Sequence, residues 1–390
     1  MRWMGTLLIV VAGCSFSGPG GGASNPDGMV GDGADGAPTC TSWSPIARHV
    51  VPCDLPVTPG PAWMVTSNST FDTTDGSVSG GNPPPSTVVN QGSGVSLRVI
   101  SVGSFEVAPG ATLRVIGSQP LLVLSWSTIQ VAGIIEVGSI RAGATVEKGA
   151  GADRSGCSAA GNGTGNSNGG GGGGGGYRLG GGAGGNGSNG SPGVGGGSIS
   201  APMDVYGGCA GGRGAGGGGA GGAGGSSGGA IQLTAKTSIT IASTGRINAG
   251  GAGGRGAQSN GGGGGGGSGG FIGLDAPMVT VESNAVLAAN GGGGGTGCKS
   301  QSGPDGSNGS LVITRAPGGP AAVCMGPTAG GGGGAFVTSG SSMEMQGEVG
   351  GSSSNDSGAG GGGGVGYILA WASAGMLQFQ GTSSPALQQP

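Results

Sequence analysis

The sequence predicts an all-β protein and, within that class, a parallel β-helix. Three observations favour this solenoid: apolar and polar residues alternate in short runs, turn residues separate the runs, and one block of runs recurs along the chain. Each coil of a solenoid buries its apolar side chains against neighbouring coils, which suits short strands of similar length. A β-sandwich or jelly roll is the alternative, and no stretch beyond the N-terminal region has helical periodicity.

The repetition is clearest where residues 228–254 can be laid over residues 269–295. Both blocks contain three short alternating runs followed by a glycine tract. The matched positions are Ile231 with Ile272, Leu233 with Leu274, Ile239 with Val279, Ile241 with Val281, and Ile247 with Leu287. Residues 95–146 have the same alternation with fewer glycines. A looser third copy includes Phe336, Met343, Met345 and Val349, and a fourth occupies residues 367–379.

Glycine accounts for 108 of the 390 residues, without the strict three-residue period of collagen. The 34% of hydrophobic residues and the net charge of −3 also argue against ordinary disorder. Ordering isolated glycine loops is costly, because glycine loses more backbone entropy than other residues. We therefore expect the tracts either to form long loops held at their ends or to stack as polyglycine-II-like layers, in which backbones approach closely.

The N-terminus has the pattern of an export signal. Arg2 is followed by a short apolar stretch that ends in Val11, Ala12, Gly13 and Cys14. This ending resembles the lipobox of bacterial lipoprotein signals, in which the cysteine is lipidated and becomes the first residue after cleavage. We therefore expect an exported chain with a lipid anchor at Cys14, held at the outer membrane or the cell surface.

The composition divides the chain into successive parts. They are a signal peptide (1–13), a flexible tether (14–38), an N-terminal cap region with Cys40 and Cys53 (39–92), the first β coils (93–150), a glycine-rich excursion (151–229), β coils alternating with glycine tracts (230–381), and a C-terminal tail (382–390).

Six cysteines remain if Cys14 is lipidated, and an even number in an exported protein indicates disulfides. Six cysteines allow fifteen pairings, and the sequence does not decide among them. Pairing of neighbours would give Cys40 with Cys53, Cys157 with Cys209, and Cys298 with Cys324. Structural zinc is not expected, because the chain has no CxxC motif and its only histidine is His49.

The sequence offers little for catalysis. A Ser-His-Asp or Cys-His site would need His49, which lies beside Cys53 in the cap region. Asp275 is matched by Thr234 in the repeat, and Glu136 and Glu147 are interpreted as solvent-facing strand residues. We therefore expect no catalytic residues, no metal and no cofactor. The one possible binding residue is Tyr177, which interrupts a pure glycine tract.

A resemblance to known proteins supports these expectations. The lipobox, the tether, the Cys40…Trp43…Pro52-Cys53 opening, and the motifs INAGGAGG and LAANGGGGG are similar to uncharacterised glycine-rich bacterial lipoproteins. The strand pattern resembles pectate-lyase-like and filamentous-haemagglutinin-like β-helix proteins. The lipoprotein resemblance implies no known activity.

These observations predict a cell-surface lipoprotein with a structural, adhesive or surface-binding role rather than an enzyme. Its expected partners are the membrane, through the lipid anchor, and polysaccharide or other cell-surface components. Nucleic acid is not expected, because the chain is weakly acidic. The alternatives are a carbohydrate-active β-helix enzyme of the polysaccharide lyase or hydrolase kind, and a flat face that binds polysaccharide or ice.

Overall fold

The structure is a computed structural model of the chain. It describes residues 43, 50–52, 55–216, 220–321, 329–331, 333–334 and 345–390. The chain forms two units, Met1–Thr39 and Cys40–Pro390, and every strand described belongs to the second. The predictions for the signal peptide, the tether, Val11, Ala12, Gly13, Cys14, Cys40, His49, Cys53 and Cys324 lie outside the described residues.

The described part of the chain is nearly all β, which confirms the predicted fold class. Sheet A has the order β4 (Ser86–Asn90), β5 (Ser96–Val102), β8 (Leu121–Ser125), β13 (Ala230–Ala235), β16 (Phe271–Asp275), β19 (Tyr367–Trp371). Sheet B has the order β1 (Trp63–Val65), β6 (Phe105–Val107), β9 (Thr128–Val131), β14 (Ser238–Ile241), β17 (Met278–Val281), β20 (Leu377–Phe379).

The remaining strands form a third sheet and a hairpin. Sheet C has the order β3 (Ser77–Val78), β2 (Ser69–Asp72), β7 (Thr112–Ile116), β10 (Ile134–Glu136), β15 (Arg246–Asn248), β18 (Val286–Ala288), β21 (Thr382–Ser384). The hairpin pairs β11 (Ile140–Ala142) with β12 (Thr145–Glu147). Within the described ranges, no helix has the length and apolarity needed to cross a lipid bilayer.

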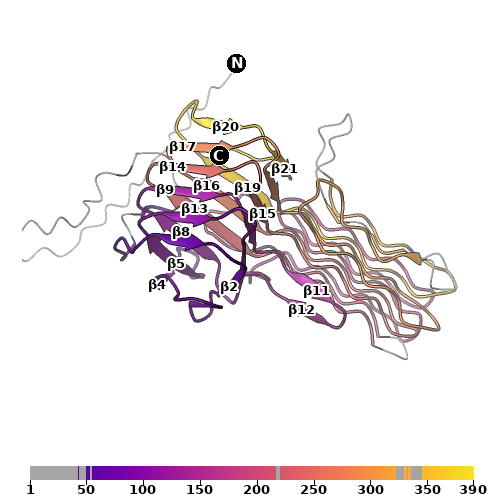
Figure 1. Cartoon of the computed structure of the whole chain (residues 1–390). Coiled ribbons are helices and arrows are strands. Elements are labelled where there is room, and N and C mark those ends of the chain that lie inside the picture. Colours follow the sequence, from indigo (N-terminus) through magenta and orange to yellow (C-terminus); the bar gives the residue numbers. More distant parts are fainter. Residues whose placement is uncertain are drawn as a thin grey trace, which may run out of the picture. The chain divides into compact units, whose positions relative to one another are not determined.

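The chain enters the three sheets in rotation. Strands β5, β6 and β7 belong to sheets A, B and C in turn, and the same order holds for β8 to β10, β13 to β15, β16 to β18, and β19 to β21. Successive strands within each sheet pair in parallel, as the stacked arrows of Figure 1 show. Two antiparallel pairs, β4 with β5 and β2 with β3, lie at the N-terminal side of the stack.

The strand register confirms the repeat that the sequence predicts. Every matched pair of the two blocks is paired across neighbouring strands: Ile231 with Ile272, Leu233 with Leu274, Ile239 with Val279, Ile241 with Val281, and Ile247 with Leu287. The fourth copy pairs directly with the second, because Phe271 lies beside Tyr367 and Val279 beside Leu377.

The prediction of a looser third copy is wrong for the residues that the structure describes. Met345 and Val349 belong to no strand, and Phe336 and Met343 lie outside the described residues. The backbone of this segment joins the glycine tracts instead, since the Gly347 N–H donates to the Gly180 carbonyl at 3.2 Å.

The main core fills the space enclosed by the three sheets. Alternate side chains of each strand point inward, among them Ile231, Leu233, Ile239 and Ile247, and all four are fully buried. Burial of each such side chain contributes about 1.5–3 kcal/mol. A second cluster covers the outer face of sheet A, where Phe271, Leu369 and Trp371 pack with aromatic residues of the glycine-rich excursion.

The glycine tracts are hydrogen-bonded to one another in extended segments. Donors three residues apart along one segment reach the same neighbouring segment. The pairs that show this are Gly171 N–H to Gly185 O, Gly174 N–H to Gly182 O, Gly172 N–H to Gly263 O, and Gly175 N–H to Gly266 O, all at 2.8–2.9 Å. A chain with three residues per turn has this periodicity, since its N–H groups point in three directions.

The segments pack around one another on all sides. Segment 169–176 forms backbone hydrogen bonds with six neighbours, which are 160–164, 180–187, 190–197, 209–215, 261–270 and 357–366. Segments 261–270, 289–297 and 357–366 likewise have six neighbours each. We call the hydrogen-bonded segments within 157–229, 249–270 and 289–366 the glycine bundle. They run side by side next to the sheets in Figure 1.

Close packing of backbones explains why these positions are glycine. A Cβ atom added to Gly173 would lie 1.9 Å from the carbonyl oxygen of Val194, far inside any allowed contact. The middles of the enclosed segments contain only glycine, namely residues 169–176, 261–267, 291–295 and 360–364. Gly81, in contrast, has open space around it.

We expect Gly173→Ala to lower the free energy of unfolding by about 3 kcal/mol, because the methyl group forces two backbones apart. The matched substitution Gly81→Ala should change it by less than about 0.5 kcal/mol. Denaturant unfolding of the oxidised protein measures both. Equal stability of the two variants would contradict the close packing of the bundle.

Candidate functional site

Side chains of the glycine bundle appear where segments lie at its outside. Exposed residues recur there at intervals of three, which is also the spacing of the backbone donors along a segment. The pairs are Ser191 and Val194, Ala210 and Arg213, Ala220 and Ala223, and Val349 and Ser352. The outer surface therefore carries single side chains at a regular spacing.

The ends of the segments away from the sheets are rich in polar residues. Segments 261–270 and 357–366 lead directly into β16 and β19, so residues 260 and 356 mark their far ends. We call the turns at these ends the polar turns. They comprise residues 164–168, 186–191, 258–260, 299–302 and 352–356.

Hydrogen bonds join the polar turns into two groups, one of residues 164–168, 186–191 and 352–356 and one of residues 258–260 and 299–302. The Ser188 N–H donates to Asp356 O at 2.9 Å, and Asn168 Nδ2 donates to Ser188 Oγ at 3.0 Å. The Asn260 N–H donates to Lys299 O at 3.0 Å. Exposed amides and hydroxyls predominate, namely Asn166, Ser167, Asn186, Asn189, Gln258, Ser300, Gln301, Ser302, Ser352, Ser354 and Asn355. Such groups bind hydroxylated ligands through many individually weak hydrogen bonds.

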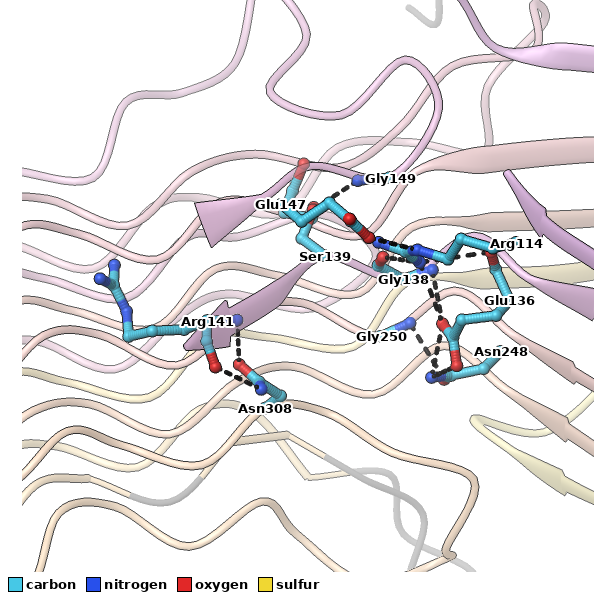
Figure 2. Close-up of polar contacts among 11 residues, drawn as sticks. Arg114, Glu136, Gly138, Ser139, Arg141, Glu147, Gly149, Asn248, Gly250 and Asn308 are labelled. Carbon is cyan, nitrogen blue, oxygen red and sulfur yellow. Dashed lines mark hydrogen bonds and ion pairs between the residues drawn. The ribbon is translucent and has the colours of Figure 1, made fainter. Parts of the chain in front are cut away.

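A separate polar cluster lies where sheet C meets the glycine bundle. Arg114, Glu136 and Asn248 occupy one row across β7, β10 and β15, because Glu136 is paired with both other residues. Figure 2 shows the Arg114 guanidinium between Glu136 and Glu147. Its Nε lies 2.6 Å from Glu147 Oε1, and its Nη1 lies 3.6 Å from Glu136 Oε1. Arg114 thus holds β12 against sheet C.

The Glu136 carboxylate is enclosed and fully engaged. Asn248 Nδ2 donates to both of its oxygens, at 3.0 and 2.9 Å, and the Gly138 N–H donates to Oε1 at 2.8 Å. The side chain is 18% exposed. Desolvation raises the pKa of Glu136, while the Asn248 and Gly138 hydrogen bonds and the charge of Arg114 act in the opposite direction.

Arg141 extends the same cluster into the glycine bundle. The residue is only 8% exposed, and its Nε and Nη2 donate to Gly253 O at 2.6 Å and to Gly224 O at 2.8 Å. Asn308 bonds to both backbone groups of Arg141, as Figure 2 shows. Desolvation lowers the pKa of the Arg141 guanidinium. The β11–β12 hairpin is therefore fastened to three glycine segments.

We call Arg114, Glu136, Arg141, Glu147, Asn248 and Asn308 the polar joint. The interpretation of Glu136 as solvent-facing is wrong, because Asn248 and Arg114 cover it. The sequence did contain one usable signal, since Glu136 and Asn248 both end the third strand of a set of three strands. Both carboxylates face donors of the chain itself, which fits a structural joint better than acid–base catalysis.

Tyr177, the predicted binding residue, is fully buried. Its hydroxyl donates to Tyr206 O at 3.1 Å, and its ring packs edge-on against Tyr367 with 5.1 Å between the ring centroids. The aromatic residue interrupts the glycine tract because the chain turns there against the outer face of sheet A. The burial gives no support to a binding role for this ring.

One predicted cysteine pair is present in the described part of the chain. Cys157 and Cys209 form a disulfide that joins the starts of segments 157–164 and 207–215. Cys298 is also disulfide-bonded, and its predicted partner Cys324 lies outside the described residues.

We expect Arg141→Ala to lower the free energy of unfolding by about 2–4 kcal/mol, because two buried charge-assisted hydrogen bonds to glycine carbonyls are lost. Arg213→Ala is the matched control, since Arg213 is exposed on an outer segment. It should change the free energy by less than about 0.5 kcal/mol. Thermal and denaturant unfolding measure the difference, and equal losses in the two variants would show that the joint does not stabilise the bundle.

Comparisons of the chain with protein-family models, with curated proteins and with solved structures find no match. We therefore infer the function from the geometry of the bundle, its polar turns and the polar joint.

Proposed function

We propose that this protein is a cell-surface lipoprotein with an adhesive or surface-binding role, in which a glycine bundle displays the polar turns to a hydroxylated polymer such as a polysaccharide. We further infer that the three sheets are the faces of a parallel β-helix and that the glycine tracts pack as polyglycine II. The lipid anchor would be Cys14, at the end of the lipobox.

Two features support the architectural part of this proposal. The chain enters sheets A, B and C in the same order in each successive set of three strands, as the coils of a β-helix do. Donors in the glycine bundle repeat every three residues, and enclosed segments have six neighbours, as in hexagonally packed polyglycine II.

The functional part of the proposal rests on one observation, the hydrogen bonding of the bundle's own backbone. The N–H and C=O groups of the enclosed segments bond to other segments, so they are not available to ligands. Contacts with a ligand must come from the side chains of outer segments and polar turns, which are mostly uncharged amides and hydroxyls. A neutral hydroxylated polymer offers matching donors and acceptors along its length, and many weak contacts then act together.

We predict that Cys14→Ser moves the protein from the membrane fraction to the soluble fraction of the cell envelope, because no lipid can be attached. Cys157→Ser, which removes a disulfide but not the lipobox cysteine, is the control and should stay in the membrane fraction. Fractionation and metabolic labelling with a fatty acid give the readout. Lipid labelling of the Cys14→Ser variant would refute the anchor.

We predict that the full-length protein is retained by at least one neutral polysaccharide in affinity electrophoresis. The triple variant Asn186→Ala, Ser354→Ala, Asn355→Ala should be retained at least about threefold less, because three exposed polar groups of the polar turns are lost. The control is Asn82→Ala, an exposed residue between β3 and β4. Retention of the triple variant at the wild-type level would show that the polar turns are not the binding surface.

A further inference from the structure

A cavity of about 580 Å³ lies between the loop that ends at Tyr206 and the turn that joins β4 to β5. Its walls include Ser93, Arg154, Met203 and Asp204. The volume is within the range of small-ligand sites, and the cavity is separate from the polar turns and from the polar joint.

Hydrogen bonds hold the two walls of this cavity together. The Ser93 N–H donates to Asp204 Oδ2 at 2.9 Å. Gln91 exchanges two hydrogen bonds with the backbone of Val205, at 2.8 and 2.7 Å. The cavity is therefore preformed, because the loop and the turn are joined at three points.

Arg154 is held in one orientation at the wall of the cavity. Its Cζ lies 3.6 Å from the centroid of the Tyr206 ring, and its backbone N–H donates to Gly208 O at 3.2 Å. Tyr206 is in turn supported by Tyr177, whose hydroxyl donates to the Tyr206 carbonyl. Stacking on an aromatic ring fixes the plane of a guanidinium and so fixes the direction in which its N–H groups point.

The charge of Arg154 is not matched within the described residues. Arg154 takes part in none of the ion pairs found there, and its Nη1 is buried without a hydrogen-bond acceptor among them, so its Nη2 is the nitrogen left for a ligand. Its Nε donates only to the neighbouring Ser155 carbonyl, at 3.2 Å. A carboxylate is the partner that a guanidinium binds with two parallel hydrogen bonds.

We propose that this cavity binds a carboxylate-bearing sugar unit, a hexuronate of an acidic polysaccharide. The sugar carboxylate bonds to the Arg154 guanidinium, and its hydroxyls donate to Asp204. The apolar face of the sugar ring packs on Met203 and Ile199. Asp204 disfavours a simple inorganic anion, because it would repel a ligand that has negative charge and no donors. The proposal rests on the proposed function only in taking a polysaccharide as the ligand class.

Titration calorimetry with trigalacturonate tests this site on the full-length, disulfide-bonded Cys14→Ser chain. The protein with an unaltered cavity should bind trigalacturonate. The Arg154→Met protein should bind it at least about tenfold more weakly, because the carboxylate loses its charged partner. Arg213→Met removes an exposed arginine elsewhere in the bundle and should leave the affinity unchanged. Equal affinity of the Arg154→Met and Arg213→Met proteins would overturn the proposal.

A footprint on Met203 tests the same site in the unaltered cavity and does not depend on the folding of a variant. Met203 is 88% exposed. Met376, which directly precedes β20, is 45% exposed. Trigalacturonate should slow the peroxide oxidation of Met203 at least threefold and leave that of Met376 unchanged. No protection of Met203, or equal protection by a neutral trigalactoside or by a free amino acid, would overturn the assignment.

These outcomes are distinct from those for the polar turns. Arg154→Met leaves every residue of the polar turns in place, and the triple variant of the polar turns leaves the cavity intact. Wild-type retention of the triple variant on neutral polysaccharide, together with protection of Met203 by trigalacturonate, would count against the polar turns alone. Reduced retention of the triple variant without protection of Met203 would count against the cavity alone.

Discussion

The close approach of glycine backbones is the constraint on which the rest of this structure depends. In the enclosed segments the N–H of one segment meets the carbonyl of the next at 2.7–3.1 Å, and a Cβ atom would overlap a neighbouring carbonyl oxygen. Each glycine loses more backbone entropy on ordering than another residue would. Backbone hydrogen bonds on all sides of a segment must offset this loss, so the bundle is stable only when many segments assemble together.

The sheets explain how the glycine segments are brought into register. Segments 221–229, 261–270 and 357–366 lead directly into β13, β16 and β19, which are neighbours in sheet A. The spacing of paired strands therefore sets the spacing at which these segments enter the bundle. The core of the sheets supplies the hydrophobic stabilisation that glycine cannot. The polar joint fastens a hairpin to segment 221–229, through Gly224, and to two further segments, through Gly253 and Asn308.

The strand-forming part of the chain could be predicted well from the sequence, because its signal is local. Ile231, Leu233 and Ile239 alternate with polar residues, and their matched positions in the next block have the same alternation, so the register followed from the repeat. The Cys157–Cys209 pair is one of the three neighbour pairings that the spacing suggested, and the sequence alone did not choose it among the fifteen possible pairings. Tyr177 could not be placed, because its neighbours in sequence are glycines and its packing partners Tyr206 and Tyr367 are distant in the chain.

The glycine bundle could be predicted only as one of two outcomes, for a physical reason. A run such as 169–176 has the same residue at each position, so nothing in it specifies which neighbour a given N–H will meet. The information lies in the outer segments instead, where Ala210 and Arg213, or Ser191 and Val194, are spaced by three residues and face solvent. That spacing distinguishes an outer segment from an enclosed one. It also limits where function can be placed in such a protein. Enclosed segments tolerate no side chain, so recognition has to be built from the outer positions, the polar turns and the loops that pack on sheet A.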